Sequence, residues 1–319
     1  MIRSLIEESI TSSQLEGAAT TREQAKDMIR NKRPPRNVHE RMIINNYATM
    51  EFLRGNMPRQ LDVGFVLGIH HRVSMGVLDK ADASGRFRLP GEDIKVVTHD
   101  GEILHTPPPA EELEQRVQNM CRFANGESES FIHPVLRAII LHFWLAYDHP
   151  FVDGNGRTAR ALFYWAMLNA GYEIFEFISI SEYILKAPVK YGQAFLYAEN
   201  DDKDLTYFIE HQLGVIEAAG TGLRNYVNLQ LERQQALGEL IRVQVRFNHR
   251  QQALLGHAIR HPGWTYTIQG HQVSHGITNM TARSDLTGLV KSGLLIKEKQ
   301  GKAFIFIVPG DVLERVKAV

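Results

Sequence analysis

Two long apolar helical segments flank one short polar segment in the middle of this chain. Residues 137–148, RAIILHFWLAYD, are apolar on nearly every helical face, and residues 159–170, ARALFYWAMLNA, are mostly apolar too. A helix that is apolar all round lies inside a protein rather than on its surface. The polar residues between them, 149–160, HPFVDGNGRTAR, are therefore predicted to form a loop between two core helices, the second beginning near Gly156–Arg157.

The start of that second helix is a predicted anion-binding site. The first turn of a helix has backbone N–H groups without intrahelical partners and carries partial positive charge. Gly154 and Gly156 let the main chain turn tightly and approach a ligand closely. Arg157 and Arg160 are three residues apart, so they share a face near this turn. Two guanidinium groups suit a polyphosphate better than a single carboxylate.

Two more side chains of the loop add chemistry to this anion site. Asp153 supplies a hard oxygen ligand, suited to Mg²⁺ that bridges phosphate oxygens. His149 is a candidate base, because the unperturbed pKa of histidine is near neutrality. Taken singly, these residues also fit an ordinary turn and a helix cap. Their combination between two buried helices favours a nucleotide site.

The segment HPFVDGNGRTAR resembles, without a departure, the HxFx(D/E)GNGRxxR signature of the Fic family of protein adenylyltransferases. The resemblance implies a mainly α-helical Fic-type core that transfers AMP from ATP to a Ser, Thr or Tyr hydroxyl of a protein. The resemblance implies that His149 is the base and that Asp153 binds Mg²⁺. It implies that Arg160 binds the γ-phosphate and that Phe151 is a buried anchor for the loop. The residues implied to bind the α- and β-phosphates are Gly154, Asn155, Gly156 and Arg157.

The N-terminal residues 4–21, SLIEESITSSQLEGAATT, carry a helical apolar stripe. Gly17 is a plausible C-cap for this helix, and Thr20 or Thr21 is expected to cap the next one. Taken alone, the segment is typical of an amphipathic helix that packs on a core.

Within that helix, SSQLEG resembles the inhibitory motif of the Fic family, (S/T)xxxE(G/N), with Ser12, Glu16 and Gly17 in the matching places. The resemblance implies that Glu16 pairs with Arg160. A carboxylate on that guanidinium removes a γ-phosphate partner and places negative charge where ATP needs positive charge. The resemblance therefore predicts an inhibitory helix over residues 4–17.

Residues 94–106 are the clearest β signal in the first two-thirds of the chain. IKVV and EILHT flank His99-Asp100-Gly101, a strong hairpin turn, and three prolines at 107–109 end the hairpin. A surface hairpin without a partner is one interpretation. In the resembled family this hairpin is the flap, whose edge pairs with the target segment, so the resemblance predicts a docked protein substrate.

Several other side chains are weaker candidates. Tyr183, Tyr191 and Tyr197 lie in a stretch that resembles the family's base pocket, although aromatic residues at such spacings are more often core residues. His70 and His71 are adjacent, so on a helix they do not face one ion, and a structural or substrate-proximal role is favoured over a metal site.

The last part of the chain, residues 246–319, differs in charge from the rest. It has ten Lys and Arg against four Asp and Glu, whereas the whole chain balances 36 against 36. Three helical runs and a terminal β pair resemble a winged helix-turn-helix module. Its candidate contact residues are Arg283, Ser284 and Lys291 on the recognition helix and Lys299 and Lys302 on the wing. DNA binding and a docking or dimerisation role stay open as alternatives.

The sequence and the family resemblance thus predict four parts: an N-terminal segment over 1–35, a Fic core over 36–225, a linker helix over 226–245 and a winged-helix domain over 246–319. The linker belongs to a long helix over 205–245, in which one or two breaks are expected. Cys121 is the only cysteine, which excludes an intramolecular disulfide. No apolar run approaches the length of a membrane span, so a cytoplasmic protein is expected.

Alternatives to AMP transfer are transfer of another nucleotide or of phosphocholine, removal of AMP from a modified protein, and a DNA-binding regulator with a nucleotide-sensing domain. Self-modification and a homodimer are further expectations about partners.

Overall fold

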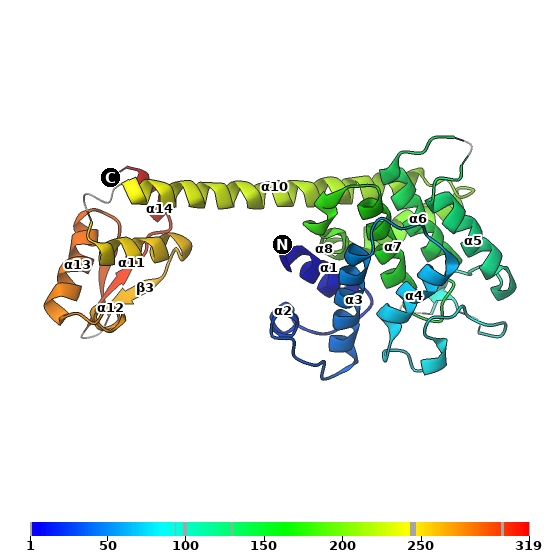
Figure 1. Ribbon diagram of the computed structural model, residues 1–319, viewed down its shortest axis with the longest axis horizontal. Helices are drawn as coiled ribbons and strands as arrows, with labels where there is room; N and C mark the ends of the chain where they lie inside the picture. The colour runs from blue at the N-terminus through cyan, green and yellow to red at the C-terminus, as the bar shows by residue number, and fades with distance from the viewer. Residues whose placement is uncertain are drawn as a thin grey trace. The chain divides into compact units, whose positions relative to one another are not determined.

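The computed structural model describes residues 2–92, 94–97, 101–128, 130–242, 247–300 and 303–318, without the side chains of residues 2, 3, 233–242 and 317. It is mainly α-helical, as predicted. The chain forms two compact units, Met1–Leu223 (unit 1) and Arg224–Val319 (unit 2). Each is considered separately (Figure 1).

Unit 1 is built from helices and a two-stranded sheet. Its helices are α1 (Ile2–Leu15), α2 (Arg22–Arg30), α3 (Val38–Gly55), α4 (Val63–Ser74), α5 (Leu113–Ala124), α6 (Pro134–Asp148), α7 (Asn155–Asn169), α8 (Ile180–Lys186), α9 (Pro188–Asn200) and the first part of α10 (Thr206–Arg242). Short 3₁₀ turns lie at Ala81–Ala83, Ala110–Glu112 and Glu173–Glu176. Side-chain N-caps from Asn37, Asp62 and Ser179 fix the starts of α3, α4 and α8.

Helices α6 and α7 form the centre of unit 1. They lie side by side in Figure 1 and pack along each other. Leu141, Leu145, Leu162 and Phe163 are fully buried between these helices and their neighbours. The prediction of two core helices is confirmed, so the loop that joins them is held by the best-packed part of unit 1.

Helix α1 packs against α3 and α8 through its apolar stripe. Leu5, Ile6 and Ile10 are buried. The helix ends at Leu15, and Gly17 follows with a φ of +85°, a value that glycine adopts without strain. The Thr21 hydroxyl then accepts the Gln24 N–H at the start of α2. The predicted helix, its glycine end and the threonine cap are confirmed.

The predicted hairpin is present as two short antiparallel strands, β1 (Val96–Val97) and β2 (Ile103–His105). Val96 pairs with His105 and Val97 with Ile103. Residues 98–100, which include most of the predicted His99-Asp100-Gly101 turn, lie outside the described part of the chain. Val97 and Ile103 are each about half exposed, so the described part of the hairpin presents apolar side chains to solvent.

Helix α10 corrects one prediction. One or two breaks were expected between 205 and 245, yet α10 continues from Thr206 to Arg242. A β-carbon at Gly222 would overlap the Tyr183 hydroxyl. The glycine therefore lets α8 pack closely on an unbroken helix, which offsets part of its intrinsic cost there. Residues 243–245 of the predicted linker lie outside the described residues.

Unit 2 contains α11 (His249–Arg260), β3 (Thr265–Thr267), α12 (Ile268–His275), α13 (Asn279–Lys291), β4 (Ile296–Gln300), β5 (Ala303–Ile307) and α14 (Val312–Lys317). The strands form an antiparallel sheet in the order β3-β5-β4. The β4–β5 pair was expected to end the chain, but α14 follows it and places Val312 and Val316 in the core. The winged-helix assignment stays a prediction.

Candidate active site at the start of helix α7

The loop between α6 and α7 has two residues in the left-handed backbone region. His149 ends α6 with φ 44° and ψ 55°, and Gly154 precedes α7 with a φ of 82°. A non-glycine residue in this region costs free energy unless its surroundings hold it there. Because α7 begins at Asn155, the N–H groups of its first turn face the loop, as the sequence predicted.

The imidazole of His149 is held in one tautomer. Its Nδ1 lies 3.1 Å from the carbonyl oxygen of Ala146. A carbonyl only accepts, so Nδ1 carries the proton and Nε2 keeps a free lone pair in the neutral ring. Burial lowers the pKa of His149 below its ordinary value of 6.5, and the positive charges of His105 and Arg88 add to this, against the Ala146 bond and Glu16. At neutral pH the ring is a neutral base.

This pKa predicts the pH dependence of any reaction that uses His149 as a base. The base works only when neutral, so the rate should rise with pH through an apparent pKa below 6.5 and stay level above it. Measuring kcat/KM between pH 5 and pH 8, with ATP held constant, tests this expectation. A rise that continues above pH 7 would contradict it.

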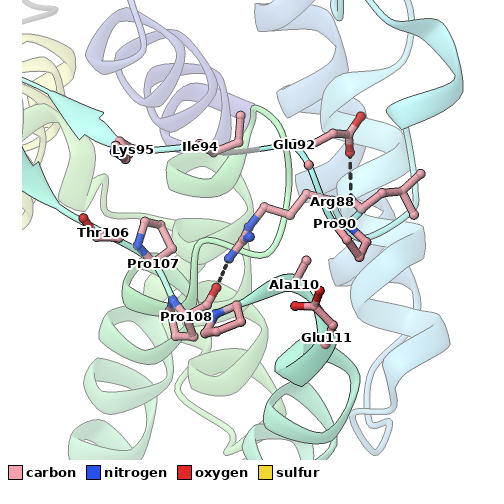
Figure 2. A pocket seen from close by; sticks show the side chains of 13 residues that line it. Arg88, Pro90, Glu92, Ile94, Lys95, Thr106, Pro107, Pro108, Ala110 and Glu111 are labelled. Carbon is pink, nitrogen blue, oxygen red and sulfur yellow. Dashed lines mark hydrogen bonds between the residues drawn. The ribbon is translucent and has the colours of Figure 1, made fainter.

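Arg88 connects the backbone of His149 to the segment that follows the hairpin. Its Nε donates to the His149 carbonyl at 3.1 Å, its backbone N–H donates to Pro150 at 2.9 Å, and its Nη2 donates to the Pro108 carbonyl. The Pro108 contact is drawn in Figure 2. Arg88 is buried at the edge of a pocket of about 280 Å³, which is lined by residues 88–92, 94, 95 and 106–111. One guanidinium thus fixes both the histidine and the base of the hairpin.

Replacing Arg88 with alanine should lower kcat and leave the KM for ATP nearly unchanged, because Arg88 bonds the histidine backbone rather than the predicted phosphate site. A decrease of roughly 10-fold is expected from the loss of one charge-assisted hydrogen bond. Arg122→Ala is the matched control, since Arg122 is exposed and pairs with Glu127. Equal kinetics for the two variants would refute a positioning role for Arg88.

Asp153 and Gly154 lie at the mouth of the anion site. The Asp153 side chain is 55% exposed and accepts the Gly154 N–H at 2.6 Å. Its other oxygen lies 3.3 Å from Nη2 of Arg157. The Asp153 carbonyl accepts a hydrogen bond from Nε2 of His70 at 2.9 Å, and Nδ1 of His70 accepts from Gly85. His70 therefore supports the loop, in agreement with the structural role favoured for it.

Two buried residues close the loop from inside. The Asn155 side chain accepts the Phe151 N–H at 2.9 Å and donates to the Phe151 carbonyl at 2.8 Å. The Phe151 ring is fully buried and stacks on His70, with 3.7 Å between centroids. The Asn155 amide is therefore occupied in shaping the loop, which leaves backbone N–H groups as the anion donors at this position.

The metal prediction depends on one carboxylate. Within the described part of the chain, no group of three or more His, Cys, Asp or Glu side chains is arranged to hold a metal ion. Mg²⁺ is commonly held by one or two carboxylates together with substrate phosphates and water. An exposed Asp153 beside a turn that is predicted to bind phosphate fits that mode, so Mg²⁺ binding by Asp153 stays a prediction consistent with the donor set.

Arg157 is fully buried. Its Nη1 donates to the Val73 carbonyl at 2.9 Å, and its Nη2 faces Asp153. Burial lowers the pKa of Arg157 against the attraction of Asp153 and Glu16. In this conformation Arg157 holds α7 to α4 and steadies Asp153, and its contact with phosphates stays a prediction.

Arg160 meets the N-terminal helix. Its Nε donates to the Ser12 hydroxyl at 2.8 Å, and its Nη2 donates to the Ser12 carbonyl at 2.9 Å and to Glu16 at 2.8 Å. Burial raises the pKa of Glu16, but the Arg160 guanidinium outweighs it, so this pKa lies below the ordinary 4.5. The pair therefore stays charged at neutral pH. The three residues predicted from two distant motifs are in direct contact.

Glu16 also lies over the start of α7. A β-carbon at Gly156 would overlap the Glu16 carboxylate. Glycine at 156 therefore permits the close approach of an anion to the first turn of α7, where the backbone N–H groups and the helix dipole favour negative charge. In this structure that anion is a carboxylate from the same chain.

The three predicted tyrosines have different environments. The Tyr191 hydroxyl lies 2.9 Å from Nε2 of His142 and beside Arg160, and burial raises the pKa of Tyr191 to about 12. Tyr183 packs against Gly222 and under Lys186. Tyr197 is half exposed and contacts Tyr207. Only Tyr191 is therefore brought to the Arg160 end of the site by the contacts described here.

Sequence reasoning did not single out four side chains that build this site: Arg88, His142, Glu8 and Tyr164. Burial lowers the pKa of His142 to about 3, so it is a neutral partner for Tyr191 near Arg160. Glu8, in the middle of α1, contacts Tyr164, which lies one helical turn after Arg160 on α7. Tyr164 follows Arg160 by four residues on one helix, and Glu8 precedes Glu16 by eight. This spacing was the sequence signal that could have linked Glu8 and Tyr164 to the pair of Glu16 and Arg160.

A buried helix–loop–helix that presents an imidazole, an exposed carboxylate, a glycine-flanked helix start and two arginines defines a Fic-type site. Residues 60–167 match the family model described as Fic/DOC family. These residues therefore carry a Fic domain. No helix in the described ranges has the length and hydrophobicity that a membrane crossing requires.

Known proteins that are similar to this chain carry Fic names. The chain is 33% identical over 132 residues to the protein adenylyltransferase Fic of Drosophila melanogaster, a match that covers 41% of this chain and 25% of the fly protein. It thus spans about a quarter of such relatives. A Fic family protein from Desulfovibrio desulfuricans has the same fold over 96% of this chain and 86% of its own (TM-score 0.63, 20% identity). Fic-1 from C. elegans has it over 72% of this chain and 64% of its own (TM-score 0.57, 22% identity).

Proposed function

We propose that this chain is a protein adenylyltransferase, which moves AMP from ATP to a Ser, Thr or Tyr hydroxyl of a protein and is inhibited by its own Glu16. The observation that supports this most directly is the Glu16 carboxylate, which pairs with Arg160 and lies against Gly156. An anion from the chain lies where the phosphate groups of ATP are expected. The relatives named protein adenylyltransferase give the reaction class.

In the proposed reaction, Nε2 of His149 takes the proton from the target hydroxyl while the oxygen of that hydroxyl attacks the α-phosphorus of ATP. A bond forms between these two atoms, the bond from the α-phosphorus to the bridging oxygen breaks, and pyrophosphate leaves. Backbone N–H groups of the first turn of α7, with Arg157 nearby, stabilise the charge that moves onto the leaving group. Asp153 would hold Mg²⁺, which would supply positive charge beside the phosphates. Arg160 binds the γ-phosphate once Glu16 has left.

The hairpin is proposed to bind the target protein. Val97 and Ile103 are half exposed and belong to a short two-stranded sheet. The free edge of such a sheet can pair with an extended main chain. The hairpin is joined through Pro108 and Arg88 to the His149 carbonyl. A target segment paired with β1 or β2 would therefore be held in a fixed relation to the base.

The test is label transfer by the full chain with ATP·Mg²⁺ labelled at either the α- or the γ-phosphate. AMP transfer to the chain itself or to lysate proteins retains the α label and loses the γ label. Retention of the γ label would overturn the proposal in favour of a kinase. Competition with unlabelled UTP or CDP-choline, and incubation with an AMP-modified target, distinguish the rival reactions.

For unit 2, DNA binding remains one proposal and protein docking the other. Arg283, Ser284 and Lys291 are exposed on α13, and Lys299 is exposed on β4, whereas Lys302 lies outside the described residues. Val273 and Met280 are also strongly exposed, which favours docking of a protein. A gel-shift experiment with the full chain at rising salt, with Arg283→Ala/Lys291→Ala as the comparison, separates the two, because phosphate contacts weaken steeply with salt.

A further inference from the structure

The buried carboxylate of Glu8 joins the middle of α1 to the rest of unit 1. The Glu8 side chain is 1% exposed. Its oxygens accept hydrogen bonds from the hydroxyl of Tyr164 at 2.9 Å, the hydroxyl of Ser179 at 2.8 Å, and the backbone N–H and hydroxyl of Ser181 at 3.1 and 2.5 Å. These donors come from α7 and from the start of α8. A buried carboxylate is stable when several donors satisfy it in this way.

The Tyr164 hydroxyl extends the network into the backbone. It accepts the N–H of Ile180 at 3.0 Å and lies 3.1 Å from the carbonyl of Ile178. The group at Glu8 therefore joins three elements, α1, α7 and the segment that begins α8. Removing α1 would take away the carboxylate that accepts from Tyr164, Ser179 and Ser181 and would also expose the apolar residues that α1 buries, among them Leu5 and Ile6.

Glu16 has fewer hydrogen-bond donors around it than Glu8 in the described part of the chain. It is on the same side of α1, eight residues further on, but it follows the last helical residue and precedes Gly17, whose φ is +85°. Its side chain is 26% exposed, and it accepts a hydrogen bond from Nη2 of Arg160 at 2.8 Å. Ser12, by contrast, is buried and holds Arg160 through both its hydroxyl and its carbonyl.

We propose that Glu8 is a permanent anchor for α1, and that Glu16 alone leaves its site when the enzyme becomes active. The movement is confined to residues 15–17, at the end of the helix. Ser12 keeps the Arg160 guanidinium in place, ready for a phosphate. The inhibitory role of Glu16 belongs to the proposed function, whereas the anchoring of α1 by Glu8 can be measured without any catalysis.

The experiment is amide hydrogen exchange, followed by mass spectrometry, on the full-length wild type, Glu16→Gly and Glu8→Gln, each with and without ATP·Mg²⁺. Peptides covering residues 5–13 should be equally protected in the wild type and in Glu16→Gly, also with ATP. In Glu8→Gln their exchange should be faster by roughly 10- to 100-fold, the effect of weakening a charged buried hydrogen-bond network. Faster exchange of these peptides in Glu16→Gly would show that α1 leaves as a whole and would overturn the proposal.

Glu7→Gln is the matched control, because Glu7 is the neighbour of Glu8 and pairs with Arg22 and Lys26 of α2. Protection over 5–13 should change far less in this variant. If Glu8→Gln does not fold, Tyr164→Phe removes one donor to Glu8 and keeps the ring, and the same loss of protection is expected. Wild-type protection in the Glu8 or Tyr164 variant would refute the anchor.

ATP binding separates failure of this inference from failure of the proposed function. Calorimetry of Glu16→Gly with ATP·Mg²⁺ reports on the nucleotide site alone. If ATP does not bind, the proposed function fails, and the exchange of Glu8→Gln still decides whether Glu8 anchors α1. If ATP binds, exchange over 5–13 in Glu16→Gly is unchanged from the wild type and exchange in Glu8→Gln is faster, the anchor stands, and label transfer decides the proposed function separately.

Discussion

Glu16→Gly is expected to raise AMP transfer by roughly 10- to 100-fold, the range that follows from removing one charge-assisted hydrogen bond from a site that ATP must occupy. The glycine removes both the partner of Arg160 and the carboxylate that lies against Gly156. Arg160 is then free to bind a phosphate in a position still fixed by Ser12. Incorporation of label from α-labelled ATP, with the KM for ATP measured in the same series, reports the change.

The control for this variant is Glu23→Gly. Glu23 is an exposed glutamate in the first turn of α2 and should leave transfer at the wild-type level. A rise in both variants would indicate a general loosening of the N-terminal segment. No rise in Glu16→Gly, with ATP bound and a target present, would contradict inhibition by Glu16.

His149→Ala, made in the active Glu16→Gly chain, is expected to lower transfer by roughly 10²- to 10⁴-fold, the usual contribution of a general base. ATP binding should stay within about threefold, because the N–H groups and arginines of the phosphate site do not depend on the imidazole. Alanine at 149 must still adopt the left-handed backbone. Thermal unfolding of the variant therefore accompanies the kinetic measurement.

The matched control is His275→Ala, since His275 is exposed in unit 2. It should leave transfer unchanged. Full activity of His149→Ala would exclude the imidazole as the base. A loss of both ATP binding and activity would show that His149 supports the loop rather than the chemistry.

Much of the site could be predicted because its chemistry lies in one continuous segment. The apolar runs around residues 149–160 placed the loop between core helices, and α6 and α7 confirm this. The contact between Glu16 and Arg160 was expected from the family motif, and the two side chains lie 2.8 Å apart. The first prediction depends on a local apolar pattern, which a sequence displays directly, whereas the second depends on the resemblance of two short motifs to the family.

The parts that were not predicted depend on contacts between distant residues. Arg88 lies in an irregular segment that departs from the helical pattern, and its partners His149 and Pro108 are set by the tertiary fold. Glu8 was treated as part of an amphipathic helix, where a charged residue usually faces solvent. Its donors at Ser179 and Ser181 are about 170 residues away. Such pairings are invisible to periodicity.

The continuity of α10 was missed for a related reason. Glycines inside a helical stretch usually indicate a break. At Gly222, however, the absent side chain makes room for Tyr183 of α8. A close approach between two helices cannot be read from the residues of one of them.

Glu16 is covalently joined to the site that it fills. Its local concentration at Arg160 is therefore set by a short tether, and dilution of the protein does not lower it. If Glu16 inhibits as proposed, ATP would compete with a carboxylate that is present once per molecule. A signal that acts on this protein need not supply or remove an inhibitor. It has only to change the fraction of time for which the Glu16 carboxylate is paired with the Arg160 guanidinium.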